Sequence, residues 1–319
     1  MSINSTFKNF NKKVNKSRRS TKSFSLNKRF ISGTAAITPG ISGLTQQSVQ
    51  MQNKYSSILS NLGSQRSSLQ NSVRQLPVGD YSLRNAGVDL AWKYEQGILE
   101  LGGSGSKNWT PSQRADIINS GKVRGIHGHH INDVSNHPQM QGDPDNIRFL
   151  SRSEHFKAHG GDWRNSTSGA RYNREALMKK ELIKGEIGRF GIAILLGVGI
   201  GLALSAFESQ LTFKERFSYG IEGAKIGGIA YTGGRIGDAI LSSITGSQLS
   251  STAKLAGIGV TASIATSIYV FYKVKRSGGS YKQAWKGAGI NLAVSLSGFF
   301  ITIIASSIWG GPAEVIYQS

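Results

Sequence analysis

Three long apolar runs lie in the C-terminal part of this chain, and none of them contains a charged residue. They cover residues 190–207, 255–272 and 287–313. Each run is long enough to cross the hydrocarbon core of a bilayer as a helix. Residues 185–319 are therefore expected to form an all-α, glycine-rich transmembrane helical domain. Buried core helices of a soluble domain are the rival interpretation, because such helices are also apolar.

Glycines and charges in this region bear on helix packing and topology. Glycines four residues apart at 197 and 201, 223 and 227, and 233 and 237 let membrane helices approach closely, so helix–helix self-association through these glycine faces is expected. Residues 221–244 carry four charges, which are costly within a span, so the count stays open at three or four spans. The segment 273–286 has five cations and no anion, which favours the cytoplasmic side. With three spans, the preceding domain lies on that side too.

A short-period pattern near the middle of the chain predicts a hairpin followed by a helix. Residues 124–131 and 146–150 have the β-branched and aromatic character of strands, and a polar loop with two prolines separates them. Ser151 and Glu154 form a capping-box pattern that starts the next helix. In that helix His155 and His159 are four residues apart and share one face. We place this unit in a domain over residues 80–184.

The N-terminal segment, residues 1–79, has no acidic residue and twelve basic ones, nine of them in the first 29 positions. It has too few apolar residues to build a core, so the segment is expected to be largely disordered, with residues 45–74 a weak helical linker. Residues 2–16 have the pattern of a basic amphipathic helix that forms on a membrane. An organellar presequence and a basic tail that holds nucleic acid are the alternatives.

Composition adds a polyanionic partner to this picture. The chain has 38 Lys and Arg against 18 Asp and Glu, a net charge of +20. Such a balance favours binding to nucleic acid or to anionic membrane lipid. The absence of cysteine excludes disulfides and thiolate chemistry.

All six histidines fall between positions 127 and 159. Imidazole can both bind a metal and exchange a proton near neutral pH, so this crowding predicts one site. The order Gly-Ile-His-Gly-His-His-Ile-Asn-Asp over 125–133, Asp-Asn-Ile-Arg-Phe-Leu over 145–150 and Ser-Arg-Ser-Glu-His-Phe-Lys-Ala-His over 151–159 resembles the HNH endonuclease superfamily. Together with Trp-Lys-Tyr-Glu at 92–95, Trp-Thr-Pro at 109–111 and His-Gly-Gly-Asp-Trp-Arg-Asn at 159–165, it resembles the GHH branch, known chiefly from bacterial polymorphic toxins. The resemblance covers residues 88–175.

The resemblance implies an α+β ββα-metal nuclease domain with assigned residues. It implies that one divalent metal ion (zinc, nickel, manganese or magnesium) is bound by His129, His155 and His159. It assigns His130 as the general base that deprotonates the attacking water, and Asn146 as the residue that orients the His130 imidazole. Candidate contacts to the nucleic-acid phosphates are the cations of the same window, Arg124, Arg148, Lys157 and Arg164.

Other residues of the window have two interpretations each. Trp92, Tyr94, Trp109 and Trp163 could stack on bases, but aromatic residues in a small domain more often form its core. Three acidic residues, Asp143, Asp145 and Asp162, could add metal ligands, but their surroundings are typical of turns.

The predicted function is a metal-dependent endonuclease that hydrolyses phosphodiester bonds of nucleic acid, DNA before RNA. It is expected to be a membrane-associated toxin or defence effector, with the nuclease domain cytoplasmic and an immunity protein among its partners. One alternative is a membrane translocation or pore-forming protein that carries a nuclease or an inactive HNH fold. Another is a structural zinc site in which His127 or His137 supplies a fourth ligand. An organellar location or a secreted toxin are alternatives to the membrane-bound bacterial one.

Overall fold

A computed structural model describes residues 40–75, 81–206, 211–245 and 251–308 of the chain. The described chain is mostly helical and has one small two-stranded sheet. It divides into two compact units. One consists of residues 50–187, and the other combines the described residues up to 49 with those from 188 onward.

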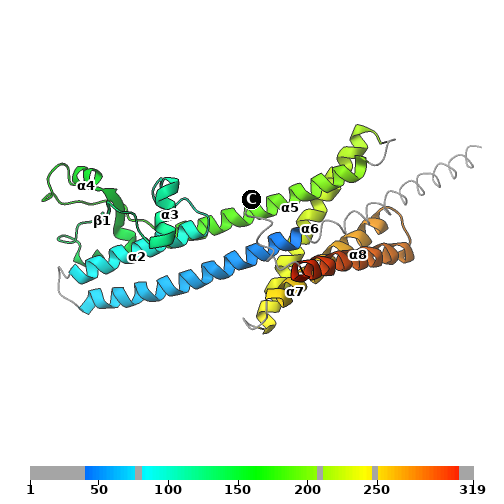
Figure 1. Ribbon diagram of the computed structural model, residues 1–319, viewed down its shortest axis with the longest axis horizontal. Coiled ribbons are helices and arrows are strands. Elements are labelled where there is room, and N and C mark those ends of the chain that lie inside the picture. Colours follow the sequence, from blue (N-terminus) through cyan, green and yellow to red (C-terminus); the bar gives the residue numbers. More distant parts are fainter. Residues whose placement is uncertain (1–39, 76–80, 207–210, 246–250, 309–319) are drawn as a thin grey trace, which may run out of the picture. The chain divides into compact units, whose positions relative to one another are not determined.

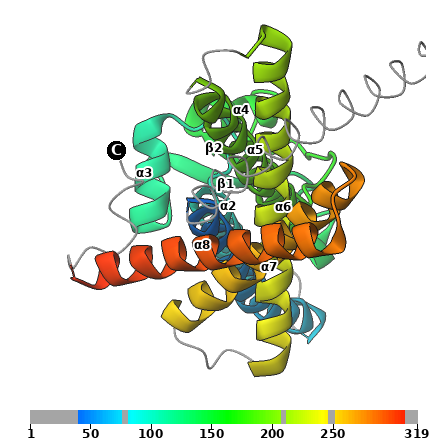
Figure 2. The ribbon, with the colours of Figure 1, turned by 90° about the vertical axis from the view of Figure 1, so that its right-hand side faces the viewer.

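The sheet of the first unit is the predicted hairpin. Strand β1 (Ile126–His130) pairs antiparallel with β2 (Ile147–Ser151), and His129 lies opposite Arg148 in the register. Helix α4 (Arg152–Ala158) follows β2 directly. Figure 2 shows the strands with α4 beside them. The β–β–α order expected from the sequence is therefore present.

Two capping boxes, one of them the box predicted at Ser151 and Glu154, set where helices of this unit begin. The Ser151 hydroxyl accepts from the backbone N–H of Glu154, whose carboxylate accepts in return from the N–H of Ser151. Thr110 and Gln113 make the same pair at the start of helix α3 (Pro111–Ser120). Gly121 ends α3 in the left-handed conformation with φ 80°, which glycine adopts without steric cost.

Helix α2 (Tyr81–Glu100) contributes to two apolar clusters. In the first, Trp92 stacks on Phe149 with ring centroids 3.8 Å apart, and Trp109 is buried next to both. In the second, Tyr94 is buried among residues of the helix over 50–75 and of the chain after residue 173. The prediction that these three aromatic residues form the core is confirmed.

The helix over residues 40–75 contains the helical linker expected at residues 45–74, so the expected disorder of the N-terminal segment does not extend to these residues. These residues form one helix, and its residues from 50 onward lie beside α2 (Figure 1). Leu62 is buried there against Leu90 and Ile98. Its Gln- and Ser-rich composition gives a weak helical signal, and packing of a few apolar residues supplies the stability that propensity does not. Residues 1–39, with the predicted amphipathic helix at 2–16, lie outside the described residues.

Besides the start of the helix over residues 40–75, the second unit contains four long helices. They are α5 (Arg174–Ala206), whose first turns belong to the other unit, α6 (Phe213–Thr245), α7 (Ser251–Arg276) and α8 (Tyr281–Ile308). Helix α7 packs against both α6 and α8. Among the described residues, two helices are long and apolar enough to cross a membrane, Arg174–Ala206 and Ala253–Arg276. The third expected span, residues 287–313, runs beyond the described residues.

The glycine faces predicted from the sequence pack helices of the same chain together. A Cβ added at Gly197 or Gly201 would collide with the backbone of α6, at Gly223 and Tyr219. A Cβ on Gly237 would meet the side chain of Thr261 in α7. At these positions the close approach is therefore within the chain, which leaves no open glycine surface there for a second copy.

Candidate metal centre

Three histidines from two adjacent elements converge in the hairpin–helix unit. Each of His129, His155 and His159 offers one nitrogen, and these three nitrogens lie within 4.8 Å of one another. The ring centroids are 4.7 Å apart for His129 and His155, 5.1 Å for His129 and His159, and 5.3 Å for His155 and His159. These are the three residues that the resemblance to HNH nucleases implies as ligands.

Local chain geometry explains how the three rings meet. His129 lies in β1, while His155 lies in α4 and His159 ends that helix as its C-cap. Gly160 and Gly161 follow with φ 61° and 84°, a left-handed pair that turns the chain back at the helix end. The returning chain lets the His159 Nδ1–H donate to the Asn165 carbonyl at 2.8 Å. The other nitrogen of His159, Nε2, is then the one with a lone pair for a metal.

Burial keeps two of the three imidazoles neutral. Desolvation lowers the pKa of His129 to about 4, and the neighbouring His155 and His159 act in the same direction. The pKa of His155 is also lowered, first by burial and then by His159 and His127. A neutral imidazole is the form that binds a metal, so these two rings are ready for a cation at neutral pH.

The donor set fits a single transition-metal ion. Imidazole nitrogen suits zinc, nickel and similar ions better than magnesium, which prefers oxygen. Within the described residues the ligand group contains these three histidines and no fourth member. His127 and His137 do not complete a closed four-ligand site there. Three protein ligands leave a position for water or substrate, which is the arrangement of catalytic rather than structural zinc sites.

His130 is the last residue of β1, directly after His129. Its Nε2 lies 2.9 Å from the carbonyl oxygen of Gln141. Because a carbonyl only accepts, Nε2 carries the proton in the neutral ring and Nδ1 keeps a free lone pair. Burial lowers the pKa of His130, the Gln141 carbonyl opposes this, and nearby Arg84 adds to the lowering. The ring is therefore oriented and neutral, as a general base requires.

Asn146 does not make the contact that the resemblance to HNH nucleases implied. It was expected to orient the His130 imidazole, but the described hydrogen bonds join its amide to Asn132 instead. Asn146 Oδ1 accepts from the backbone N–H of Asn132 at 2.9 Å, and Asn146 Nδ2 donates to the Asn132 carbonyl at 2.9 Å. Asn146 is fully buried. It holds the chain just after β1 in place, and Gln141 orients His130.

Positive charge and an exposed indole surround the three histidines. Arg148 lies directly opposite His129 on the neighbouring strand, and cross-strand partners share a sheet face. Arg124, Lys157 and Arg164 are exposed in the same unit, as Arg148 is. Trp163 is 48% exposed, with its ring 5.1 Å from His155 and 5.8 Å from His159. Unlike the other three aromatics, it is not part of the core.

The acidic residues of this region have structural partners. Asp143 caps the short 3-10 turn at Pro144–Asn146 and forms ion pairs with Arg66 and Arg171. Asp145 pairs with Arg66 at 2.9 Å. Asp162 accepts from the backbone N–H of Arg164. All three lie outside the ligand group, and their predicted assignment to turns holds.

Glu95 and Arg174 are structural residues of this unit that sequence reasoning did not single out. Their buried ion pair ties α2 and the start of α5 to β2, because Arg174 also donates to the Ile147 carbonyl at 2.7 Å. They are 79 residues apart, and no local sequence pattern connects them.

Comparison with known proteins agrees with the site. Residues 81–151 match the family of GHH signature containing HNH/Endo VII superfamily nuclease toxins. This confirms the resemblance over that segment. The segment contains strands β1 and β2, and with them the site residues His129 and His130.

Curated relatives match part of the chain. Teneurin-4 of Mus musculus is 28% identical over 114 residues, which is 36% of this chain and 4% of that protein. Teneurin-3 of Mus musculus is 31% identical over 71 residues, 22% of this chain and 3% of that protein. Teneurin-m of Drosophila melanogaster is 27% identical over 84 residues, 26% of this chain and 3% of that protein. The chain thus spans only a few per cent of these relatives. No solved structure matches it significantly.

Proposed function

We propose that this chain is a metal-dependent endonuclease that hydrolyses phosphodiester bonds and prefers DNA to RNA. The match of residues 81–151 to a nuclease toxin family supports the nuclease part of this proposal. The observation that carries the proposal is the convergence of His129, His155 and His159 within 4.8 Å beside an oriented, neutral His130. The closed structural zinc site has less support, because a fourth protein ligand is absent from the described group.

The residues divide the chemistry between them. His129, His155 and His159 would hold one divalent ion, which supplies Lewis-acid stabilisation of charge on the phosphate oxygens. His130 Nδ1 takes the proton of the attacking water, while the Nε2–H bond to Gln141 keeps the ring from turning. Asn146 supports this arrangement indirectly, because its two hydrogen bonds to the Asn132 backbone fix the chain after β1.

Substrate binding is assigned to the exposed cations around the histidines. Arg148 on β2 lies opposite His129 in the register, and Lys157 on α4 lies between His155 and His159 in the sequence. Arg124 precedes β1 and Arg164 follows α4. A guanidinium can contact a phosphate through two N–H groups. Such contacts are to the backbone of the nucleic acid and give affinity without base specificity.

Membrane association and a toxin or defence role complete the proposal. The helices Arg174–Ala206 and Ala253–Arg276 have the length and composition of membrane spans, and the basic end of α7 with Lys273, Lys275 and Arg276 favours a cytoplasmic side. The family match to toxins supports a partner that neutralises the activity, an immunity protein. The second candidate function is translocation or pore formation by the helical unit, which the same two helices favour.

The test uses the full-length chain in detergent, made metal-free and then incubated with supercoiled plasmid or RNA and a panel of divalent metals. We expect metal-dependent nicking that is lost in His130→Ala and in His159→Ala. His137→Ala is the matched control, since His137 lies outside the ligand group. If the wild type binds the metal but cleaves neither the plasmid nor the RNA, the nuclease proposal fails. Leakage of dye from liposomes would then support the pore-forming alternative.

A further inference from the structure

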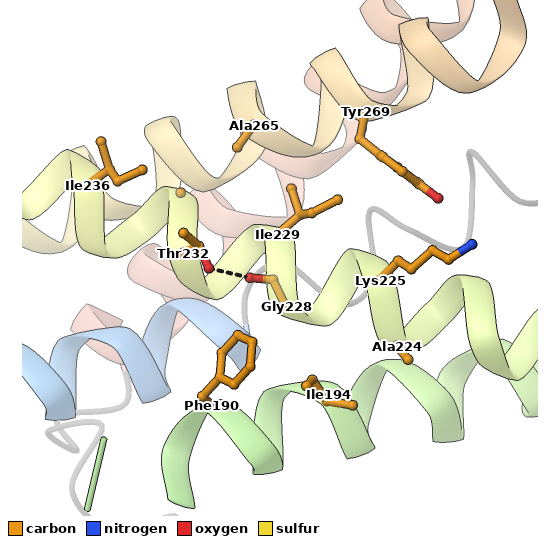
Figure 3. Close-up of a pocket in the computed structure, with 11 residues that line it drawn as sticks. Phe190, Ile194, Ala224, Lys225, Gly228, Ile229, Thr232, Ile236, Ala265 and Tyr269 are labelled. Carbon is orange, nitrogen blue, oxygen red and sulfur yellow. Dashed lines mark hydrogen bonds between the residues drawn. The ribbon is translucent and has the colours of Figure 1, made fainter. Parts of the chain in front are cut away.

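A groove in the helical unit has the properties of a lipid-binding site. It is an open cavity of about 610 Å³ between α5, α6 and α7, and Figure 3 shows the residues that line it. Phe190 and Ile194 come from α5, Gly228 and Ile236 from α6, and Tyr269 from α7. Phe190 and Ile236 expose much of their apolar side chains. A partner that covers them must itself be apolar.

The groove has a polar end and an apolar end. Lys225 is the one charged residue among the eleven that line it. In Figure 3 Lys225 and Tyr269 lie together at one end, while Ile236 lies at the other. From Lys225 to Ile236 the α6 backbone rises about 16 Å, at 1.5 Å per residue. A ligand that fits is therefore long, apolar and charged at one end.

The polar end carries an excess of positive charge. Lys225 and Lys273 both form ion pairs with the single carboxylate of Glu222, at 2.8 and 2.6 Å. Tyr269 donates to the same carboxylate at 2.6 Å. Two ammonium groups thus share one anion. Each ammonium has three N–H donors, and the Lys225 side chain is 50% exposed, so it can also donate to an external oxyanion.

We propose that this groove binds an anionic phospholipid, with one acyl chain along Phe190, Ile194 and Ile236 and the phosphate at Lys225. This inference rests on the membrane association proposed above. The orientation of the groove agrees with membrane association, because Tyr269 at its polar end lies one helical turn before the basic end of α7. In a membrane, that end lies at the level of the lipid headgroups.

Charge argues against the chain's own N-terminal segment as the occupant. Residues 1–39 contain nine basic residues and no acidic one. Such a segment would bring more positive charge to Lys225. An anionic headgroup is complementary there, and a zwitterionic lipid gains less from the same contact.

The experiment measures lipid retention by the full-length chain in detergent, using native mass spectrometry. Dioleoyl phosphatidylglycerol is compared with dioleoyl phosphatidylcholine, which has the same acyl chains. Two variants are made at the groove, Gly228→Leu and Lys225→Gln. A Cβ on Gly228 meets only Phe190 ring carbons at 3.5 Å and then Ile194, so a leucine there fills the groove. Gly199→Leu and Lys282→Gln are the matched controls, since a Cβ on Gly199 meets nothing within 4 Å and Lys282 is exposed.

We expect the wild type to retain phosphatidylglycerol in preference to phosphatidylcholine. Lys225→Gln should weaken retention of phosphatidylglycerol by roughly fivefold, the effect of one lysine near a headgroup, and leave phosphatidylcholine unchanged. Gly228→Leu should lose both lipids, and both controls should match the wild type. Inorganic phosphate should not displace the lipid, because it lacks the acyl chain.

Each contrary result overturns a specific part of the proposal. Equal retention of the two lipids excludes the headgroup contact, and wild-type retention by Gly228→Leu excludes the groove. Equal losses in Gly199→Leu also count against the groove, because the effect would then come from any added side chain. A flotation assay with vesicles separates this inference from the proposed membrane association. If the wild type floats while the variants retain lipid normally, only the groove assignment fails.

Discussion

The carboxylate of Glu95 and the guanidinium of Arg174 form an ion pair at 2.9 Å with both side chains fully excluded from solvent. The pair is completed by further donors and acceptors. Glu95 also accepts from Trp109 Nε1 at 2.6 Å and from the Ser106 hydroxyl at 2.7 Å, and Arg174 Nε donates to the Pro144 carbonyl at 2.9 Å. Because every partner is in place, the buried charges are compensated, and the network connects α2 and α5 to the loop that leads into β2.

Removal of one partner should therefore destabilise the unit that holds the metal centre. Arg174→Met leaves the Glu95 carboxylate buried without its counter-ion, and we expect the free energy of unfolding to fall by about 3–5 kcal/mol. Urea unfolding followed by tryptophan fluorescence measures this change. Lys54→Met is the control, because the Lys54–Glu100 pair is partly exposed and should contribute less than about 1 kcal/mol. Similar losses in both variants would contradict a special role for the buried pair.

Metal affinity should depend on His155 and not on the neighbouring exposed His127. His155→Ala removes one of three ligands, and we expect a loss of metal affinity larger than the roughly 10–100-fold that changes to supporting residues cause. His127 occupies the same strand face as His129 two residues earlier, yet it is not in the ligand group. His127→Ala should therefore leave the affinity nearly unchanged. Competition with a coloured zinc chelator measures both.

His127 also offers a check on the identity of the general base. Cleavage lost in His127→Ala and kept in His130→Ala, with metal affinity unchanged in both, would assign the base to His127.

The amide of Asn146 should matter for stability before it matters for chemistry. It makes two hydrogen bonds with the backbone of Asn132 and a third with the side chain of Asn132 at 3.0 Å. Asn146→Ala leaves buried backbone groups unpaired, so we expect a loss of about 2–4 kcal/mol. Thermal unfolding measures the loss of stability. Cleavage is then assayed at a temperature below the unfolding midpoint of the variant, to test whether the folded variant still cleaves. If cleavage disappears while stability is unchanged, Asn146 acts on the reaction itself, as its place in the HNH motif implies.

Cleavage should continue at pH values below the ordinary pKa of histidine. The base must be neutral, and burial lowers the pKa of His130 from 6.5. The rate should therefore stay constant as the pH falls through 6.5 and decline only when His130 takes up a proton at lower pH. Arg84 contributes to the lowering, so Arg84→Met should move the acid limb of the profile to higher pH. The exposed Lys122, changed to methionine, is the control that should leave the limb in place.

Local patterns in the sequence predict the two strands, the capping box of α4 and the shared helix face of His155 and His159. These features depend on residues a few positions apart, where geometry follows directly from the element. The assignment of His129, His155 and His159 as metal ligands comes instead from the resemblance to HNH nucleases. The contacts of Asn146 and the pair of Glu95 with Arg174 could not be predicted in this way. Glu95 and Arg174 are 79 residues apart, and nothing in the local pattern of either residue indicates the other.

The sequence predicted the helix at residues 45–74 only as a weak linker, for a related reason. Its composition is polar, and the helix is stabilised by burial of Leu62 against Leu90 and Ile98 of α2. Such stabilisation exists only after the elements meet.

Sequence reasoning about the membrane part had a different limit. Length and apolar composition predict membrane spans, but they do not say whether the glycine faces pack within one chain or between copies. The positions of α5, α6 and α7 show that these faces pack within the chain.

Trp163 should bind substrate without taking part in metal binding. Its indole is 48% exposed and lies edge-on to His155, with Phe156 beside it at 5.2 Å. An exposed indole near the reacting phosphate can stack on a base, and one stacked base contributes about 1–3 kcal/mol. We expect Trp163→Ala to raise KM by roughly tenfold with kcat retained, and Trp163→Phe to recover part of the loss.

Metal affinity and steady-state cleavage of an oligonucleotide, measured on the same preparations, distinguish this role from a structural one. Tyr81→Ala is the control for loss of an exposed aromatic ring in the same unit, since Tyr81 is 74% exposed. It should change neither constant. A joint fall of kcat and metal affinity in Trp163→Ala would mean that the indole instead supports His155 and His159, because a ring that only stacks on substrate leaves the ligands where they are.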